Sequence, residues 1–564
     1  MGTGMHANRL RNCRSLAMVS LLLSAAGAVG LAAPGPAAYS NWQRPVGTGL
    51  PEGSARITLQ TALHVQVPQP ATLPGVPRTR LPGLSARKAA GLRIPVATLP
   101  ARFVVTRAKP AKAPKPKPYF GLRWDPTEPV RPPDCTIAKG PAQILQVVNS
   151  RLTVLDDRGR IVLDDGDGHN FVRLQSLFAS ISGTEDVEWF GPRCLYDEGS
   201  QRFILAVAGA DFAEKDEAWL GIAISSGPDP QAGAWTVYAY RTDLDGTAPE
   251  ARWADAVDVG VDGTFLVATW NEQAFNTNQF LRSRVRVFDK VGLISGEQPA
   301  YVDFSRLQDT NGDLSFAVRP CRHRGNKSAF YLVNSKPLGG ATLELWRLTG
   351  TPEAPVLDSM TVTGIYNYAV PPDARQTGVP TSNFPGALDT GDTRVLSAVA
   401  DGDRIWTTLN TSLDGLVASS AIHISELDGA AGSVVQSRGI GATGWDYFFA
   451  ALDTTAGTKP GVAILFGASS PKQAPSLRYS SRNSGMSPGE FRVSKPLITG
   501  KGKYDPLAPR DPSDPGPPVA WGRYFSAARD PARPYQVLLC GAYSDATASR
   551  DPRAWATKLQ YVKP

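Results

Sequence analysis

The sequence predicts an all-β protein, a six- or seven-bladed β-propeller preceded by a disordered arm rich in proline and lysine. The chain of 564 residues contains 54 Gly and 48 Pro, which is typical of a fold with many turns. From about residue 140, short β-type runs alternate with Gly, Asp, Pro and Asn turns, and helical periodicity is hard to find. One turn-and-strand unit also recurs along this part of the chain. A double β-sandwich is the alternative architecture.

The recurring unit is an acidic or Gly/Asn turn followed by a β-rich run. Asp-Gly and Asn-Gly turns supply the positive φ that tight hairpins require. Seven units recur at intervals of about 40–77 residues, which is the scale of a propeller blade. Because a four-stranded sheet cannot bury both of its faces alone, blades packed around an axis are the expected solution. The units are Asp157–Leu163, Asp197–Val207, Asp262–Trp270, Arg324–Val333, Asp401–Leu409, Asp453–Phe466 and Asp530–Cys540.

Residues 1–38 have the layout of a secretory signal peptide. Three arginines and no acidic residue precede a weakly apolar run, and small residues between about 28 and 38 offer the cleavage position. A single-pass membrane anchor is the alternative. We therefore expect an exported protein, periplasmic or extracellular, with no membrane span after cleavage. The composition, rich in Ala, Arg and Pro, suggests a bacterial source.

The cysteine content is compatible with export. Cys13 lies in the signal region, so four cysteines remain after cleavage: Cys135, Cys194, Cys321 and Cys540. Four cysteines allow three pairings, and the sequence does not choose among them. No Cys/His spacing suggests a zinc site.

Residues 39–133 form a basic, proline-rich linker, and residues 134–564 form the predicted propeller domain. The linker holds 17 prolines and 15 basic side chains against 3 acidic ones, whereas the propeller domain has a net charge of −7. Its run from Arg107 to Pro118 cannot donate a regular ladder of N–H groups, which favours an extended polyproline II spacer. The functional alternative is an electrostatic tether to anionic envelope polymers or lipid head groups. Nucleic acid is not an expected partner, because few aromatic residues accompany the basic ones.

One turn resembles the Asp-box hairpin of sialidase-like propellers. It follows Ile222–Ser226 and consists of Gly227-Pro-Asp229-Pro-Gln-Ala-Gly233-Ala-Trp235. In that family the box is a structural turn remote from the active site, so the resemblance implies a turn and a Trp packed between sheets.

The chain from about residue 145 to 562 resembles exported bacterial propeller proteins of unassigned activity. Such a likeness implies a fold and almost nothing about chemistry. Arg523 and Phe525 depart from the W-G-D-Y-S-x-x-x-x-D-P signature that the last segment resembles. The matching segments are Gly191–Asp197, Ile224–Pro230, Trp253–Gly260 and Trp521–Pro531.

An acidic turn provides the candidate metal site. Asp164, Asp165 and Asp167 lie within seven residues of the chain together with His169 and Asn170. Hard oxygen ligands of this kind suit Ca²⁺, although the spacing does not match an EF-hand loop. A solvated turn without an ion is the alternative, and no other cofactor is expected.

Motifs of zinc proteases and P-loops are absent from the sequence. Sialidase-type hydrolysis would need an arginine cluster, a Tyr/Glu nucleophile pair and an acid Asp, and no local motif groups these residue types. The aromatic run Trp445–Phe449 suits either stacking on sugars or the core between blades. Isolated candidates are the arginines Arg252, Arg282, Arg284 and Arg319 and the histidines His64, His169, His323 and His423.

The leading hypothesis is therefore a non-catalytic exported propeller that binds a protein or polysaccharide through loops on one face of the disc. A carbohydrate-active hydrolase with a sialidase-like propeller is the alternative from another class, and a structural surface-layer component is a third. The sequence does not identify catalytic residues or a ligand.

Overall fold

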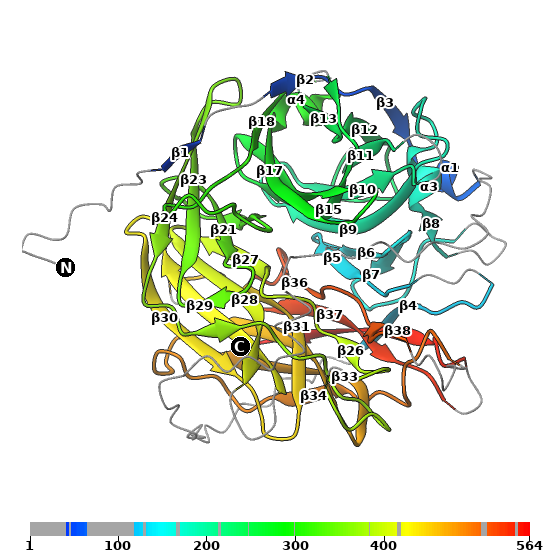
Figure 1. Cartoon of the computed structure of the whole chain (residues 1–564). Coiled ribbons are helices and arrows are strands. Elements are labelled where there is room, and N and C mark those ends of the chain that lie inside the picture. Colours follow the sequence, from blue (N-terminus) through cyan, green and yellow to red (C-terminus); the bar gives the residue numbers. More distant parts are fainter. Residues whose placement is uncertain are drawn as a thin grey trace, which may run out of the picture.

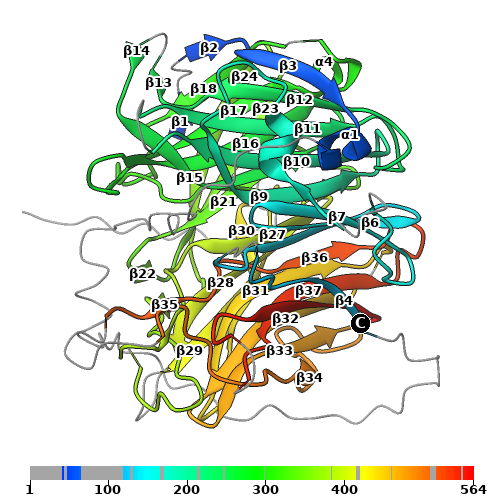
Figure 2. The ribbon, with the colours of Figure 1, turned by 90° about the vertical axis from the view of Figure 1, so that its right-hand side faces the viewer.

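The computed structural model describes residues 41–43, 47–64, 118–127, 131–164, 170–212, 216–245, 248–297, 299–382, 384–413, 419–458, 460–508, 516–547 and 551–564. Seven sheets stand radially around one axis and form a seven-bladed β-propeller, seen roughly end-on in Figure 1 and from the side in Figure 2. The predicted propeller is confirmed, and the double β-sandwich is wrong. The predicted signal peptide, residues 1–38, lies outside the described residues. Among the helices described, none has the length and apolarity needed to cross a membrane.

Each of the first three blades places its earliest strand nearest the axis and its latest strand toward the rim. Blade 1 contains β5 (Cys135–Lys139), β6 (Gln143–Val148), β7 (Arg151–Asp156) and β8 (Val172–Arg173). Blade 2 contains β9 (Glu188–Asp197), β10 (Arg202–Ala210), β11 (Ala218–Ser225) and β12 (Trp235–Arg241). Blade 3 contains β15 (Arg252–Val261), β16 (Phe265–Ala274), β17 (Phe280–Asp289) and β18 (Tyr301–Ser305).

The remaining blades keep this order, with two additions. Blade 4 contains β19 (Arg319–Pro320), β21 (Phe330–Ser335), β23 (Leu343–Gly350) and β24 (Pro355–Val362). Blade 5 contains β27 (Val395–Asp401), β28 (Arg404–Leu413), β29 (Ser419–Asp428) and β30 (Ser433–Ile440), with β20 (Arg322–Arg324) parallel to β27 on the axial side. Blade 6 contains β31 (Asp446–Thr454), β32 (Val462–Ser470), β33 (Gln473–Arg482) and β34 (Lys495–Ile498). Blade 7 contains β36 (Ser526–Arg529), β37 (Val537–Ser544), β38 (Trp555–Val562) and β4 (Tyr119–Arg123) from far upstream.

Short elements complete the described part of the molecule. Three two-stranded ladders lie in loops: β13 (Leu244–Asp245) with β14 (Ala248–Pro249), β22 (Gly339–Gly340) with β25 (Tyr368–Ala369), and β26 (Leu388–Asp389) with β35 (Val519–Ala520). The described helices are α1 (Leu59–His64), α3 (Leu174–Phe178) and α4 (Lys290–Ser295).

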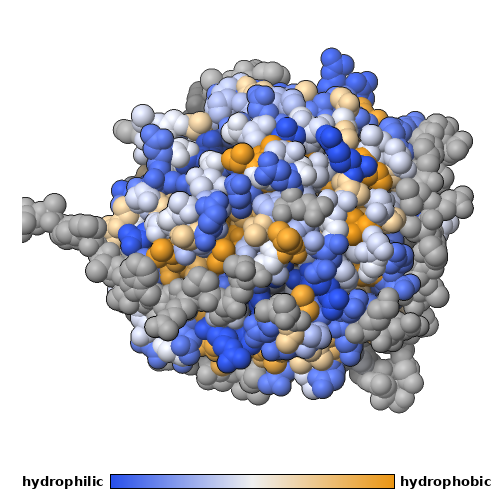
Figure 3. Space-filling model, turned by 90° about the horizontal axis from the view of Figure 1, so that it is seen from above, coloured by the Kyte–Doolittle hydropathy of each residue, from blue (hydrophilic) through white to orange (hydrophobic). Residues whose placement is uncertain are grey.

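The core lies between neighbouring blades, where strands of β-branched and aromatic residues face each other. Tyr447, Phe448 and Phe449 of the aromatic run are buried in this core, which confirms the core interpretation over sugar stacking. The Asp-box turn is also structural: Trp235 is fully buried, and its Nε1 donates to the carbonyl of Pro230 at 2.8 Å. On the edge of the disc that carries β2 and β3, hydrophobic side chains are scattered among hydrophilic ones (Figure 3).

Described segments upstream of the blades form a belt along the rim, defined as residues 41–43 and 47–57. β1 (Asn41–Gln43) pairs with β24 of blade 4, β2 (Gly47–Gly49) with β18 of blade 3, and β3 (Gly53–Ile57) with β12 of blade 2. α1 follows beside α3 and β8 of blade 1 (Figure 1). Each outer strand offers unpaired N–H and C=O groups, which an extended segment can satisfy.

The prediction that all of residues 39–133 form a linker is therefore wrong for the belt, α1 and β4. The composition of this range is dominated by proline and basic residues. The strands among them are too short to show a periodic alternation of apolar and polar residues, so the sequence did not reveal them. Residues 65–117, which include nearly all of the Lys/Pro run, lie outside the described residues.

Strand β4 closes the ring, because it is the outermost strand of blade 7 and leads directly into blade 1. It pairs antiparallel with β38, and the Thr557 hydroxyl donates to the carbonyl of Leu122 at 2.7 Å. Gln146 of blade 1 joins the same seam: its Oε1 accepts from the Leu122 N–H at 2.9 Å, and its Nε2 donates to Thr557 at 3.0 Å. A Cβ on Gly121 would lie 2.1 Å from that Oε1, so a larger residue at 121 would displace the Gln146 amide from this seam.

Replacing Leu122 with alanine should destabilise the whole propeller, because its side chain is only 4% exposed in the core under β4. We expect a loss of about 2–4 kcal/mol in the free energy of urea unfolding. The matched control is Phe120→Ala on the same strand, where the ring is 48% exposed and the expected loss is below about 1 kcal/mol. Equal effects of the two substitutions would show that β4 does not hold the ring.

Candidate ligand-binding funnel

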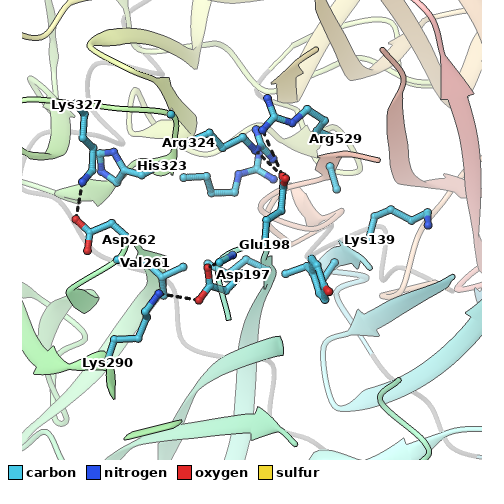
Figure 4. A pocket seen from close by; sticks show the side chains of 18 of the residues that line it. Lys139, Asp197, Glu198, Val261, Asp262, Lys290, His323, Arg324, Lys327 and Arg529 are labelled. Atoms are coloured by element: carbon cyan, nitrogen blue, oxygen red, sulfur yellow. Dashed lines mark hydrogen bonds and ion pairs between the residues drawn. The ribbon is translucent and has the colours of Figure 1, made fainter. Parts of the chain in front are cut away.

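The carboxyl ends of the innermost strands meet at one opening of the axial channel. Residues at the ends of β5, β9, β15, β20 and β36 line a cavity of about 280 Å³ there, and α4 adds one side (Figure 4). This cavity is called the funnel below. Loops from several blades converge on it, as expected for a binding site on a propeller.

The acidic turns predicted from the sequence repeat build the wall of the funnel. After β9, Asp197 accepts from the Gly199 N–H at 3.1 Å and from the Ser200 hydroxyl at 2.6 Å, so the turn holds Glu198 toward the cavity. After β15, the Asp262 carboxylate accepts from the N–H groups of Thr264 and Phe265, each at 2.7 Å. The same type of turn therefore ends the inner strand and places a carboxylate beside the axis.

Cationic side chains outnumber carboxylates in the funnel lining. Three carboxylates line the cavity: Asp197, Glu198 and Asp262. Six cationic side chains line it: Lys139, Lys290, Arg322, Arg324, Lys327 and Arg529.

The Asp453 carboxylate, near the end of β31, accepts hydrogen bonds from two of these arginines, Arg324 and Arg529. Arg324 donates to both of its oxygens, at 2.5 and 2.9 Å, and the backbone N–H of Arg529 donates at 2.8 Å. Burial alone would raise the pKa of Asp453, but the charges of Arg324 and Arg322 outweigh it and lower that pKa to about 2. Asp453 is therefore a permanent anion that orders this cluster.

Glu198 lies against the other side of the same arginines. Its Oε1 is 3.3 Å from Nη2 of Arg529 and 3.4 Å from Nε of Arg324, and its side chain is 42% exposed (Figure 4). Arg529 also contacts Asp401 at 3.3 Å. A partly exposed carboxylate thus occupies the side of the arginine pair that faces the cavity.

The lysines of the funnel are paired as well, but each pair lies in the wall. Lys290 contacts Asp197 at 2.8 Å, and Lys327 contacts Asp262 at 2.6 Å (Figure 4). Lys139 is fully buried and reaches Asp157 at 3.0 Å. These pairs fix the positions of the charges around the opening.

His323 and Tyr196 are poorly suited to acid–base chemistry in this setting. Burial and then the Lys327 ammonium lower the pKa of His323 to about 3, and its Nε2 accepts from the Tyr331 N–H at 3.0 Å. Burial, reinforced by Glu198 and Asp197, raises the pKa of Tyr196. At neutral pH the imidazole is neutral and the phenol is protonated.

Below the funnel the channel narrows into two cavities of about 30 Å³ each. Arg319 contacts Asp258 there at 2.5 Å, and the Arg193 guanidinium stacks on the Tyr524 ring at 3.3 Å. Arg523, which departs from the family signature, contacts Asp255 at 2.5 Å. The segments that carry the family resemblance around Arg193, Asp255 and Arg523 thus meet along the axis.

Other predicted site residues lie apart from the funnel. Arg252, Arg282 and Arg284 belong to an ion-pair network with Glu272 in blade 3, at 3.3, 2.5 and 2.5 Å. His423 is buried, and burial lowers its pKa to about 4. His64 lies in α1, on the rim.

The predicted calcium turn falls largely outside the described residues. Asp164 is exposed there, whereas Asp165, Asp167 and His169 are not described. No group of three or more His, Cys, Asp or Glu that could hold a metal ion occurs in the part of the chain that the structure describes. The calcium site stays a prediction.

Sequence reasoning missed the arginines Arg322, Arg324 and Arg529 as a group, because Arg529 follows the other two by more than 200 positions in the chain. The recurring turn was the available signal, since Arg324, Asp401 and Asp453 each stand at the start of a predicted unit. Turns that end equivalent inner strands must face the same opening.

Comparison with known proteins finds distant structural similarities. The chain is similar to the α-L-arabinofuranosidase Arb93A of Fusarium graminearum, with 8% identity, 80% of this chain and 98% of that chain covered, and a TM-score of 0.34. It is also similar to the Trypanosoma rangeli sialidase, with 8% identity, 75% and 59% covered, and a TM-score of 0.37. A protein of unknown function from Dyadobacter fermentans gives 12% identity, 67% and 96% covered, and a TM-score of 0.29. No protein family and no curated protein matches the chain.

Replacing Asp453 with asparagine should destabilise the protein by about 3–5 kcal/mol at pH 7, because buried arginines lose their counter-ion. The folded-state pKa of about 2 lies below the ordinary value of 3.8, so the stabilisation is present above pH 4 and is lost as the pH falls through 2. The difference between wild type and variant in urea unfolding should therefore shrink between pH 4 and pH 2.

The control is Asp428→Asn, which removes a surface contact with Arg404 at 3.6 Å. Its expected cost is below about 1 kcal/mol. A pH-independent difference for Asp453→Asn would contradict the assignment of Asp453 as the buried anion of the cluster.

Proposed function

We propose that this protein is an exported, non-catalytic propeller that binds the anionic group of a saccharide or polymer in its funnel. The observation that carries the proposal is the pair of arginines, Arg324 and Arg529, that lies at the cavity against the partly exposed carboxylate of Glu198. Cationic clefts with low-dielectric walls attract and hold anions.

The arginine pair is the central feature of the proposed site. Arg324 is fixed by Asp453, and a guanidinium fixed in this way presents its remaining N–H groups in a constant direction. Glu198, at 3.3–3.4 Å, occupies the position that a ligand carboxylate, phosphate or sulfate would take. An incoming anion therefore competes with the protein's own side chain.

The size of the funnel limits the ligand. Its volume of about 280 Å³ lies at the low end of small-molecule pockets and suits one sugar-sized unit or the acidic end of a longer polymer. An acidic polysaccharide of the cell envelope has such groups in series.

Binding is favoured over hydrolysis by the state of the funnel carboxylates. A glycosidase acid needs a raised pKa, usually in an apolar pocket. Ion pairing instead keeps the pKa of Asp262 in the lining below its ordinary value, and it does the same for Asp453, which lies behind the arginines. Asp197 is likewise paired, with Lys290.

Export is supported by the signal-like residues 1–38, and the basic composition of the linker supports contact with anionic envelope polymers. If the linker and the funnel both prefer anions, both would bind polymers of the same anionic envelope surface. This combination suits a periplasmic or extracellular scaffold.

Titration calorimetry tests the proposal with galacturonate, glucose 6-phosphate and N-acetylglucosamine 6-sulfate, each against its neutral sugar. We expect the charged sugars alone to bind, more weakly at higher salt. Glu198→Gln should tighten binding by about 3–10-fold, because it removes the competing charge with little change in shape. The control is Asp229→Asn, an exposed carboxylate of the Asp-box turn, which should leave the affinity unchanged.

Equal or weaker binding by Glu198→Gln would contradict the proposed site, and binding of the neutral sugars would contradict the proposed chemistry. A panel of chromogenic glycosides tests the alternative. Robust turnover, abolished by substitution of a funnel carboxylate, would replace binding with carbohydrate hydrolysis.

A further inference from the structure

Two buried cysteines meet at the seam between the first and last blades. Cys135 begins β5, the innermost strand of blade 1, and Cys540 lies in the middle of β37 of blade 7. Their sulfur atoms are 3.1 Å apart although the residues are 405 positions apart in the chain. Both side chains are fully buried.

The other two cysteines have different surroundings. The sulfur of Cys194 is 3.6 Å from the Thr136 hydroxyl. Cys321 is buried in the core between blades 4 and 5, with Tyr331 and Val395. The geometry therefore favours a single bond, between Cys135 and Cys540.

The seam around these two sulfur atoms is held by a polar group that suits a disulfide. Nε2 of Gln146 lies 3.3 Å from the sulfur of Cys540 and 3.8 Å from that of Cys135. A disulfide has lone pairs and no S–H donor, so an amide N–H that faces both sulfurs is a compatible neighbour. The same Nε2 also donates to the Thr557 hydroxyl, and the Oε1 of Gln146 accepts from the Leu122 N–H, which holds the amide in place.

We propose that Cys135 and Cys540 form a disulfide bond that locks the ring of blades covalently, while Cys194 and Cys321 stay thiols. Two S–H bonds break and one S–S bond forms, with release of two protons and two electrons. The electrons pass by thiol–disulfide exchange to a small disulfide oxidant of the glutathione class, whose own S–S bond breaks to give two thiols. The bond does not depend on the ligand of the funnel, so the two proposals fail separately.

The bond forms while blade 7 is docking, before the seam is buried. Exchange requires a thiolate that an oxidant can reach. In the folded protein both sulfurs are excluded from solvent, and burial raises the pKa of the Cys540 thiol. Oxidant present during folding should therefore link the pair much faster than oxidant added afterwards.

The Cys135–Cys540 disulfide would prevent the ring from opening between blades 1 and 7 by the loss of non-covalent contacts alone. Without it, blade 7 can leave blade 1 once the β4–β38 hydrogen bonds and the packing at the seam break. With it, the chain from Cys135 to Cys540, which includes the inner strands of all seven blades, is a closed loop. Long closed loops restrict the unfolded chain strongly.

Peptide mapping tests the pairing. Reduced, unfolded protein is refolded with oxidised glutathione, treated with an alkylating reagent under denaturing conditions and digested. Mass spectrometry should show a Cys135–Cys540 linked peptide and alkylated Cys194 and Cys321. Cys321→Ala should retain the linked peptide, whereas Cys540→Ala should lose it.

Alkylation of all four cysteines, or a link that involves Cys194 or Cys321, would overturn the proposal, and wild-type protein suffices for either result. Unfolding kinetics in urea test the lock. Oxidised wild type should unfold at least about tenfold more slowly than wild type refolded under reducing conditions, whereas Cys540→Ala should unfold at the same rate in both preparations. A linked peptide without any change in unfolding rate would show that the bond does not lock the ring.

Discussion

The pairing of β4 with β38 is the interaction on which the rest of the molecule depends. A propeller blade is stable only when both faces are covered, so a ring open at one seam leaves two blades half exposed. Blade 7 takes three strands from the C-terminal end of the chain and its outer strand from residues 119–123. The energy of closure comes from this ladder, from Leu122 in the core beneath it and from Gln146 across the seam. Residues that precede the first blade are therefore part of the propeller.

Closure also creates the funnel. The ends of β9, β15, β20 and β36 approach one another only when every blade is in its place. The arginines that converge on Asp453 come from β20 of blade 5 and β36 of blade 7. Bringing such charges together costs desolvation energy, which the Asp453 ion pairs offset. An open ring would leave Asp453 without these partners. The site is thus a property of the assembled ring and not of any single blade.

The fold could be predicted from the sequence because its signal is repeated, whereas the site could not because its signal is dispersed. A turn such as Asp262-Gly263 indicates a hairpin locally, and several such turns at the spacing of propeller blades indicate a propeller. By contrast, Arg324 and Arg529 are 205 positions apart, and only the three-dimensional ring shows that both face Asp453. The belt escaped prediction for another reason: β1 and β2 have three residues each, too short for a period of two to show.

The recurring turn contributes to both the fold and the candidate site, and Asp197 illustrates how one aspartate does so. The Asp197 carboxylate closes the β9–β10 turn through Gly199 and Ser200, and the same turn holds Glu198 at the cavity. The turn requires Asp197, but it makes no structural demand on the identity of the residue at 198, whose side chain is 42% exposed. Substitutions at the tips of these turns, as at Glu198, can therefore change the charge of the funnel without disrupting the hairpins. Propellers with the same ring can accordingly bind different ligands, since the fold fixes where the tips converge and leaves their chemistry free.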